Sequence, residues 1–469
     1  MVPKGIVLTP DSDGYEASLQ RWSQTCVKRA AVVVKPTNAN EVSAAVTFAT
    51  SHKLPFAVKG GGHATSGVSA CEDGMAIDLD LLRGVSVDPE TKLVSIGGGC
   101  RWTDVNEELW KHGLATVGGT VADTGVGGLI LGGGMGFLTP QYGLCTDLLV
   151  EAEVVTADGK IRVVSDKDGV SEEDKDLFWA LRGAGQNFGV VTRFTTQAFP
   201  QGHVYSGSVV VGLDQLDAVV DFSNVMIERQ DERSTLVFAV THLPHGEELV
   251  AGVLCIVFYN GSEEEGRRFF APLLAVATVD MTKEMPWPET NVQLGQVGEE
   301  SKWRRLQGGS TFVPPLQADT VRKAVVDEFL PFAASQPGMK NPITMILYEI
   351  LPNKKVRSVP HTATAFAARD NIYHISTLFQ WEDPALDMTV RHFNRKMIRM
   401  LRELGGIKDG VTQYNNYDTA GPISPEHVFG VNLERLRAIK ARLDPDNVFF
   451  KWLSLYPRPA APGDDEQPL

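Results

Sequence analysis

Residues 117–149 read VGGTVADTGVGGLILGGGMGFLTPQYGLCTDLL, and this glycine-rich stretch decides how the rest of the chain is interpreted. Glycines this dense do not suit the interior of a helix or a strand, where each one lacks a side chain to pack. They include Gly118, Gly119, Gly125, Gly127, Gly128, Gly132, Gly133, Gly134 and Gly136. Because a backbone without side chains can approach a ligand closely, we expect a long, extended ligand to lie along several loops.

A second glycine cluster lies upstream, where residues 59–68 read KGGGHATSGV after the apolar run PFAV. Backbone N–H groups in such a loop can bind a pyrophosphate, although an ordinary tight turn also explains the composition. Neither cluster reads G-x-G-x-x-G at the start of a helix, and neither contains a Walker A lysine. A dinucleotide, if bound, is therefore expected in a fold other than the Rossmann fold.

The pattern of apolar residues changes near residue 200. Before it, short strands alternate with helices, as in the strand at 30–36, the helix at 38–54 opened by Asn40, and the strand at 55–61. After it, apolar runs typical of an antiparallel sheet recur with helices between them, at 203–211, 234–243, 253–260, 343–351 and 372–381. A further helix is expected at 427–445. The sequence thus predicts an α+β protein with two domains.

Composition excludes several classes of function. The 469 residues carry a net charge of -14, so nucleic acid and anionic membrane surfaces are unexpected partners. The five cysteines have no C-x-x-C spacing, which favours free thiols over disulfides or a metal site. No signal peptide and no apolar stretch long enough to span a bilayer is evident, so a cytoplasmic location is expected.

Several motifs together resemble one family, the FAD-linked oxidases of the vanillyl-alcohol oxidase superfamily, in the berberine bridge enzyme-like branch. The motifs lie at 54–69, 74–89, 94–144, 149–160, 177–194, 363–370, 413–418 and 429–449. The resemblance implies a two-lobed, PCMH-type FAD-binding domain in residues 1–200 and an α+β substrate domain, an antiparallel sheet covered by helices, in 201–410. It also implies that residues 411–460 return to the FAD domain, followed by a disordered tail at 461–469.

The resemblance implies FAD as the cofactor, with one covalent link to the protein and most of its contacts in the two glycine clusters. No metal site is expected. The cofactor-binding residues implied by the resemblance are Lys59, Gly60, Gly61, Gly62, His63, Ala64, Ser66, Gly118, Thr120, Thr124, Gly125, Gly127, Gly128, Leu129, Gly132, Gly134, Tyr142, Gly143, Gly189, Val190, Val191 and Asn416.

The resemblance further implies that His63 bonds covalently to the 8α-methyl carbon of the flavin, which raises the redox potential of the ring and prevents its loss. Some members of the branch add a cysteine link at the position of Val121 and carry a histidine at that of Leu129, and this chain has neither. Thr124 falls at the family's oxygen-access position and is small. Lys59 replaces the usual arginine and could serve a phosphate.

The catalytic base is expected from the second domain or the returning C-terminal segment. Tyr414 and Asn416 match the family's Y-x-N-Y stretch beside the flavin, although these residues could also form a structural loop. In the strand at 343–351, Tyr348 and Glu349 face opposite ways, and we expect Tyr348 to face the flavin with a depressed pKa. His374 is a further candidate base, or a histidine of the core.

The expected activity is that of an oxidase, in which a small organic alcohol, amine or phenol is dehydrogenated by hydride transfer to flavin N5 and O₂ is reduced to H₂O₂. Two alternatives stay open. One is a dehydrogenase that uses another electron acceptor, and the other is a cyclase or isomerase that keeps the flavin without net redox change. The expected partners are thus a small-molecule substrate and O₂.

Overall fold

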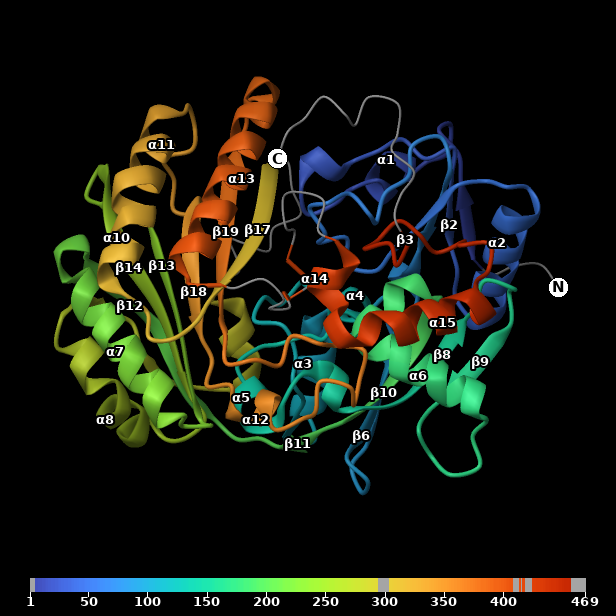
Figure 1. The fold of residues 1–469 in the computed structure, drawn as a ribbon, viewed down its shortest axis with the longest axis horizontal. Coiled ribbons are helices and arrows are strands. Elements are labelled where there is room, and N and C mark those ends of the chain that lie inside the picture. Colours follow the sequence, from blue (N-terminus) through green and yellow to red (C-terminus); the bar gives the residue numbers. More distant parts are fainter. Residues whose placement is uncertain (1–4, 294–302, 408–412, 415, 418–423, 457–469) are drawn as a thin grey trace.

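The computed structural model describes residues 5–293, 303–407, 413–414, 416–417 and 424–456. Two sheet systems stand side by side in Figure 1: two smaller sheets formed by the first part of the chain, and one large sheet formed by the middle part. The tail predicted to be disordered, 461–469, lies outside the described residues. Among those described, no helix has both the length and the apolar character needed to cross a membrane.

The first small sheet has the strand order β1-β2-β4-β3. Its strands are Ile6–Leu8, Val32–Lys35, Met75–Asp78 and Phe56–Lys59, in that order. β2 and β3 both run parallel to β4, and the helix α2 (Ala39–Ser51) connects β2 to β3. The prediction that Asn40 opens this helix is wrong, because the side chain of Asn38 accepts the hydrogen bond from Glu41 N–H and caps it.

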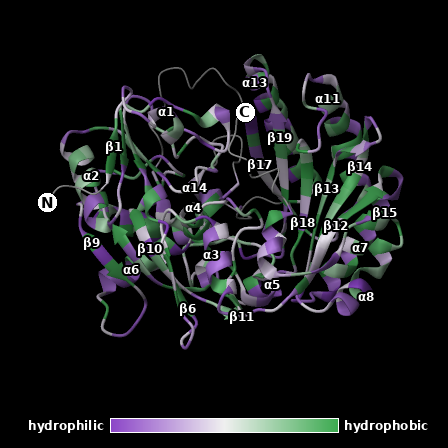
Figure 2. Ribbon diagram, turned by 180° about the vertical axis from the view of Figure 1, so that it is seen from behind, coloured by the Kyte–Doolittle hydropathy of each residue, from purple (hydrophilic) through white to green (hydrophobic). Residues whose placement is uncertain are grey.

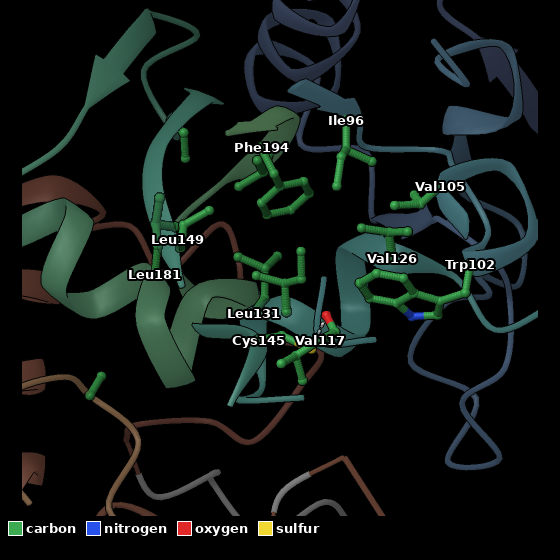
Figure 3. Close-up of a cluster of buried hydrophobic side chains, with 14 of the residues drawn as sticks. Ile96, Trp102, Val105, Val117, Val126, Leu131, Cys145, Leu149, Leu181 and Phe194 are labelled. Carbon is green, nitrogen blue, oxygen red and sulfur yellow. Dashed lines mark hydrogen bonds between the residues drawn. The ribbon is translucent and has the colours of Figure 1, made fainter. Parts of the chain in front are cut away.

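The second small sheet is antiparallel throughout, in the order β5-β6-β10-β8-β9. Its strands are Val85–Asp88, Leu93–Gly97, Val190–Gln197, Leu149–Val155 and Ile161–Val164. The helices α3 (Trp102–Trp110), α4 (Val126–Leu131) and α6 (Glu172–Ala184) pack on it. Their apolar side chains form a common core with the strands, in which Trp102, Val126 and Phe194 are fully buried (Figure 3). This core supports the glycine-rich segment from beneath.

Several short elements complete the connections between the sheets. β7 (Leu114–Ala115) pairs with β11 (Phe199–Pro200) just before the chain enters the large sheet. The short helices are α1 (Tyr15–Ser18), α5 (Thr139–Tyr142) and α12 (Lys354–Arg357). The five cysteines are free and buried, as the sequence predicts.

The large sheet is antiparallel, in the order β15-β12-β14-β13-β18-β19-β17, with β16 pairing to β12. The central strands are β12 (Val204–Gly212), β14 (Glu248–Tyr259), β13 (Ser234–His245), β18 (Met345–Ile350) and β19 (Tyr373–Trp381). The edge strands are β15 (Ala277–Asp280), β16 (Lys283–Met285) and β17 (Arg304–Phe312). These strands confirm the α+β class and the antiparallel sheet expected after residue 200.

Helices cover one face of this large sheet. They are α7 (Leu216–Arg229), α8 (Glu263–Leu274), α10 (Ala318–Ala324), α11 (Leu330–Ser335) and α13 (Asp387–Leu404). Figure 2 shows strands that are largely hydrophobic and helices that alternate hydrophobic with hydrophilic residues. The apolar sides of both meet in one core cluster. The opposite side of the sheet, which these helices do not cover, points toward the glycine-rich half of the molecule.

The C-terminal segment returns to the first half of the chain, where α15 (Leu433–Leu443) packs against α6 (Figure 1). The helix predicted at 427–445 is interrupted, because Gly430 adopts a positive φ of 46° between α14 (Pro425–Phe429) and α15. Lys440 anchors α15. Its buried ammonium donates to the carbonyl of Asn187, to the carboxylate of Asp444 and to the carbonyl of Phe449, at 2.6, 2.5 and 2.8 Å.

Replacing Lys440 with methionine is expected to lower the free energy of unfolding by about 3–5 kcal/mol, since Asp444 is then left as a buried charge without its cation. Urea-induced unfolding, followed by tryptophan fluorescence, measures the change. Lys396→Met is the matched control, because Lys396 pairs with Glu328 at the surface, where such a pair contributes about 1 kcal/mol or less. Equal shifts in the two variants would contradict the anchoring role.

Candidate active site

Three glycine-containing loops meet above the two small sheets. A Cβ on Gly61 would collide with the backbone of Gly125, and one on Gly125 would collide with Gly61. Gly98 also contacts the second cluster, since its carbonyl oxygen would lie 2.9 Å from a Cβ added to Gly127. Gly98 was not among the predicted cofactor residues, although it lies in the run GGG at 97–99. The close approach of these backbones explains why glycine is needed at each point.

Two glycines of these loops face open space instead. Gly128 is exposed, and a Cβ added to it would meet no atom within 4 Å. A Cβ on Gly60 would meet only the carbonyl oxygen of Gly98, at 3.6 Å. Gly128 lies in the first turn of α4, directly after the second glycine loop, and its carbonyl accepts a hydrogen bond of 3.1 Å from the amide of Gln186. The loops therefore present bare backbone on the side that faces away from their mutual contact.

His63 lies at the end of the first loop with its imidazole held on two sides. The ring stacks on the indole of Trp22, with ring centroids 5.6 Å apart and planes inclined by 16°. Its Nε2 atom lies 3.2 Å from Oδ2 of Asp123, a residue of the second glycine cluster. About a fifth of the His63 side chain stays exposed. The predicted histidine is thus accessible, oriented, and placed where the loops converge.

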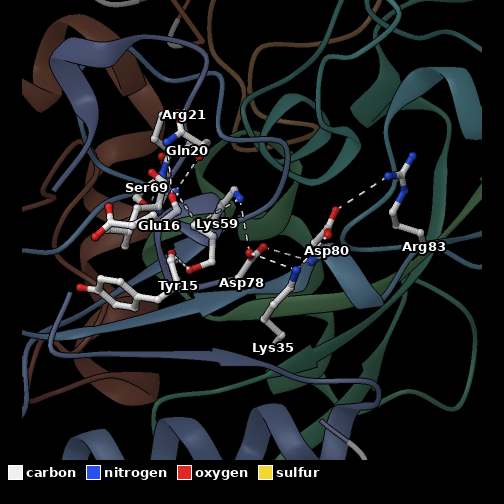
Figure 4. Close-up of polar contacts among 12 residues, drawn as sticks. Tyr15, Glu16, Gln20, Arg21, Lys35, Lys59, Ser69, Asp78, Asp80 and Arg83 are labelled. Carbon is white, nitrogen blue, oxygen red and sulfur yellow. Dashed lines mark hydrogen bonds and ion pairs between the residues drawn. The ribbon is translucent and has the colours of Figure 1, made fainter. Parts of the chain in front are cut away.

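Lys59 does not occupy the position predicted for it. Its ammonium is buried and lies 3.3 Å from Oδ2 of Asp78 and 3.4 Å from the carbonyl of Ser18 (Figure 4). Lys35 approaches the same carboxylate at 3.9 Å. Because the charge of Lys59 is neutralised in the interior, the expectation that it serves a phosphate is wrong.

The remaining predicted cofactor residues divide into two groups. One group lies in or beside the converging loops: Gly62, Ala64, Ser66, Thr120, Thr124, Leu129 and Gly132. The other is packed into the protein: Gly118 lies over the ring of Trp102, Gly134 lies against Cys145, Gly143 lies near Asp147, Gly189 lies against Val155, Tyr142 stacks on Phe199, and Val190 and Val191 lie in core clusters. The residues of this second group are thus in contact with the protein interior.

The C-terminal segment brings Tyr414 and Asn416 onto the second glycine cluster. The Asn416 amide donates to the carbonyl of Leu129 at 2.9 Å and to the hydroxyl of Tyr414 at 3.0 Å. A Cβ on Gly132 would collide with the Asn416 side chain, so glycine is required there. The ring of Tyr414 lies 5.4 Å from that of His374 in the large sheet. Both halves of the molecule therefore contribute to one site.

The large sheet presents Glu349 and His374 to this site, and not Tyr348. Tyr348 stacks on Phe238 with ring centroids 4.8 Å apart, in the core beneath the helices. Glu349, on the opposite face, pairs with His374 in the β18–β19 register and accepts a hydrogen bond of 2.5 Å from the hydroxyl of Tyr417. The prediction that Tyr348 faces the flavin is wrong, because alternation along the strand defines two faces without telling which one the helices cover.

Burial changes the proton affinities of these groups. It raises the pKa of Glu349 to about 7, against which the hydrogen bond from Tyr417 acts. It lowers the pKa of His374 to about 4, so this imidazole is neutral at physiological pH. Burial also raises the pKa of Tyr414 well above that of a free phenol, so this hydroxyl stays protonated. Burial likewise raises the pKa of Tyr348, whereas a depressed pKa was expected for this residue. Glu349 is thus the group that titrates near neutral pH.

A mostly apolar pocket leads to the two polar groups of the sheet. Its lining includes Met135, Leu144, Phe366, Ile372, Glu349 and His374. The Oε2 atom of Glu349 and the Nδ1 atom of His374 are both buried and lack a hydrogen-bond partner within the described residues. Buried polar atoms of this kind are normally satisfied, so they are available to a bound molecule.

The geometry fits a flavin dinucleotide. The bare backbone at Gly60 and Gly128 suits a pyrophosphate, and the partly exposed imidazole of His63 follows Gly60 in the same loop. Asn416, Tyr414 and the polar pair on the sheet close the site from the opposite side. The residues that would hold FAD therefore come from the glycine loops, and those that would meet a substrate come from the sheet and the C-terminal segment.

Comparison with known proteins gives a consistent result. Residues 30–165 match a family described as FAD binding domain, and residues 413–454 match one described as berberine and berberine like. The chain is 33% identical to the FAD-linked oxidoreductase pgmH of Aspergillus terreus, over 94% of this chain and 91% of the relative. It is 37% identical to the (R)-6-hydroxynicotine oxidase of Paenarthrobacter nicotinovorans, over 42% of each chain.

Solved structures share the same fold. The 6-hydroxy-D-nicotine oxidase of Arthrobacter nicotinovorans superposes with a TM-score of 0.83 at 24% identity, covering 97% of this chain and 98% of that one. A chitooligosaccharide oxidase superposes with a TM-score of 0.79 at 23% identity, covering 97% of this chain and 98% of that one. At these identities the structures establish the fold, and the activity has to be argued from the site.

Proposed function

Because the chain belongs to the berberine bridge enzyme-like family of FAD-linked oxidoreductases, we propose that it is an oxidase that dehydrogenates a small organic molecule and transfers the electrons to O₂. The observation that carries this proposal is the buried carboxylate of Glu349. It lines a pocket together with Met135 and Leu144 of the second glycine cluster, titrates near neutral pH, and has one oxygen without a partner in the described chain. These are the properties of a general base for an O–H or N–H proton.

Each polar residue then has a distinct task. Glu349 removes the proton from the substrate heteroatom, while Tyr417 donates a hydrogen bond that keeps the carboxylate oriented. The neutral imidazole of His374 forms a hydrogen bond to the same part of the substrate. Tyr414, held by Asn416, acts as a neutral donor because its phenol does not ionise.

FAD, when bound, supplies the hydride acceptor at N5 and the site at which O₂ is reduced to H₂O₂. We propose that His63 holds it covalently, since its imidazole is accessible and oriented at the meeting point of the loops. Val121 cannot form a second bond of the kind that a cysteine would supply. Thr124, which is small, leaves O₂ a path toward the ring.

The pocket indicates the class of substrate. Its lining combines apolar side chains with polar ones, among them Asn353, Asp370, Glu349 and His374, and this suits a molecule with an apolar body and a reacting alcohol, amine or phenol group. The relatives named above include oxidases of a hydroxynicotine and of a chitooligosaccharide. A panel of cyclic amines, aromatic alcohols, phenols and small sugars therefore tests the proposal.

The test measures two quantities on the purified protein. The first is H₂O₂ release in air for each compound of the panel, and the second is bleaching of the flavin absorbance by the same compound under nitrogen. An oxidase bleaches anaerobically and recovers its colour with peroxide release when air is admitted. Turnover without bleaching would show a non-redox cyclase, and bleaching without recovery in air would show a dehydrogenase; either result overturns the proposal.

The glycine loops provide a prediction about binding of the cofactor. Gly128→Ala should fold normally, because its Cβ would point into open space, but should bind FAD at least about tenfold more weakly if the dinucleotide lies there. Fluorescence titration of the apoprotein with FAD measures the affinity. Gly202→Ala is the matched control, since its Cβ also meets open space but lies in the connection between β11 and β12. Unchanged affinity in Gly128→Ala would contradict the assignment of the pyrophosphate site.

A further inference from the structure

The carboxylate of Asp123 has an unusual environment. Both of its oxygens are buried, and neither accepts a well-aligned hydrogen bond from any described residue. Within the described chain, the basic atom that comes within ion-pair distance is Nε2 of His63, at 3.2 Å. A buried carboxylate destabilises the folded protein unless a partner compensates its charge, so the position of Asp123 beside His63 indicates a function.

The turn that carries Asp123 is fixed by its backbone. The amide of Thr124 donates to the carbonyl of Val121 at 3.2 Å, and the amide of Trp102 donates to the carbonyl of Thr124 at 3.1 Å. The carbonyl of Ala122 accepts from both the amide and the hydroxyl of Thr103, at 2.8 and 2.9 Å. The backbone from which the Asp123 side chain projects toward His63 is therefore fixed.

The opposite constraint comes from Trp22, whose indole fixes the plane of the His63 ring. Trp22 in turn packs against Met345 and Leu378 of the large sheet. With the ring plane set by Trp22 and Nε2 lying 3.2 Å from the carboxylate, Nδ1 lies on the side of the ring away from Asp123. A carboxylate beside one ring nitrogen holds the proton there and leaves the other nitrogen with its lone pair free.

We propose that Asp123 is a positioning residue for flavin attachment: it keeps the proton of His63 on Nε2 and presents Nδ1 as the nucleophile. This inference rests on the covalent link proposed above. The new bond joins Nδ1 to the 8α carbon of the flavin. One proton leaves that carbon for solvent and a second leaves Nε2 for Asp123, while the electron pair of the broken C–H bond reduces the ring. O₂ then takes that electron pair together with two protons and leaves as H₂O₂. The negative charge beside Nε2 also stabilises the positive charge that develops on the imidazole.

The experiment compares wild-type protein with Asp123→Asn, Asp123→Glu and the exposed control Asp221→Asn. Apoprotein is mixed with FAD in air, and covalent flavin is read as fluorescence of the protein band in a denaturing gel over time. Non-covalent binding is measured separately by titration, and folding by circular dichroism. We expect Asp123→Asn to attach flavin at least about tenfold more slowly while still binding it, Asp123→Glu to recover part of the rate, and Asp221→Asn to match the wild type.

Three results overturn the inference in distinguishable ways. Attachment at the wild-type rate in Asp123→Asn removes the role of Asp123 and leaves the covalent link intact. A bond at Nε2, identified by NMR of the isolated flavin peptide, shows that the carboxylate does not select the nitrogen. Wild-type protein that binds FAD without any covalent fraction removes the link itself, whereas the oxidase activity is tested independently by peroxide release.

Discussion

Replacing Glu349 with glutamine is expected to lower kcat/KM by a factor of about 10²–10⁴, the usual contribution of a positioned general base. The amide keeps the size of the side chain and a hydrogen bond to Tyr417, but it cannot take a proton from the substrate. Steady-state peroxide release with the best substrate of the panel measures the loss. Flavin content and its absorbance spectrum should not change, because Glu349 lies on the sheet and not in the glycine loops.

The neighbouring residue provides the control. Tyr348→Phe changes a side chain of the same strand that is buried in the opposite face. Since only an interaction made at the reacting centre changes the rate strongly, kcat/KM should stay within about threefold of wild type. A large loss in Tyr348→Phe together with a small one in Glu349→Gln would reverse the assignment of the faces.

The pH dependence has a definite sign. A general base acts when deprotonated, so kcat/KM should rise with pH and level off above the pKa of Glu349, about 7. His374, whose pKa is lowered to about 4, stays neutral across this range and adds no second transition there. In Glu349→Gln the rising limb should disappear. A limb that persists unchanged in the variant would assign the titration to another group.

Replacing His63 with alanine is expected to abolish covalent flavin completely. After acid denaturation the wild-type pellet should be yellow, whereas all colour from His63→Ala should pass into the supernatant. The redox potential of flavin bound to the variant should also be lower, since the imidazole substituent no longer withdraws electron density. His245→Ala is a suitable control, because His245 is an exposed histidine at the end of β13 in the large sheet. A yellow pellet from His63→Ala would place the link elsewhere.

The residues best predicted from the sequence are those whose role depends on local backbone. The two glycine clusters indicate close approach of the backbone, and Gly61 indeed lies against Gly125, whereas Gly60 and Gly128 face open space. The motif at 413–418 likewise led to Tyr414 and Asn416, which lie at the second glycine cluster. The family followed from these motifs and the α+β fold from the change in apolar pattern near residue 200, and both are confirmed.

The residues predicted wrongly depend on long-range packing. Tyr348 and Glu349 point to opposite faces of the sheet. Which of the two faces is covered by helices is decided by α7, α10 and α13, which are remote from both residues along the chain. Lys59 looked available for a phosphate because its partner, Asp78, lies in a separate strand. The edge strand β17 was missed because Gly308 and Gly309 interrupt its apolar pattern. Glycine is nevertheless needed at position 309, where a Cβ would collide with the side chain of Tyr417.

The anchoring of α15 has a consequence for the order in which the protein matures. Tyr414 and Asn416 meet the second glycine cluster from the C-terminal segment, and the helix that follows them, α15, is tied to the first half of the chain by the bond from Lys440 to the carbonyl of Asn187, just beyond α6. On the ribosome, the chain emerges from its N-terminus, so the first lobe exists long before this helix is synthesised. The pocket is therefore completed in one of the last steps of biosynthesis, and the nascent chain carries an open, half-built site until then.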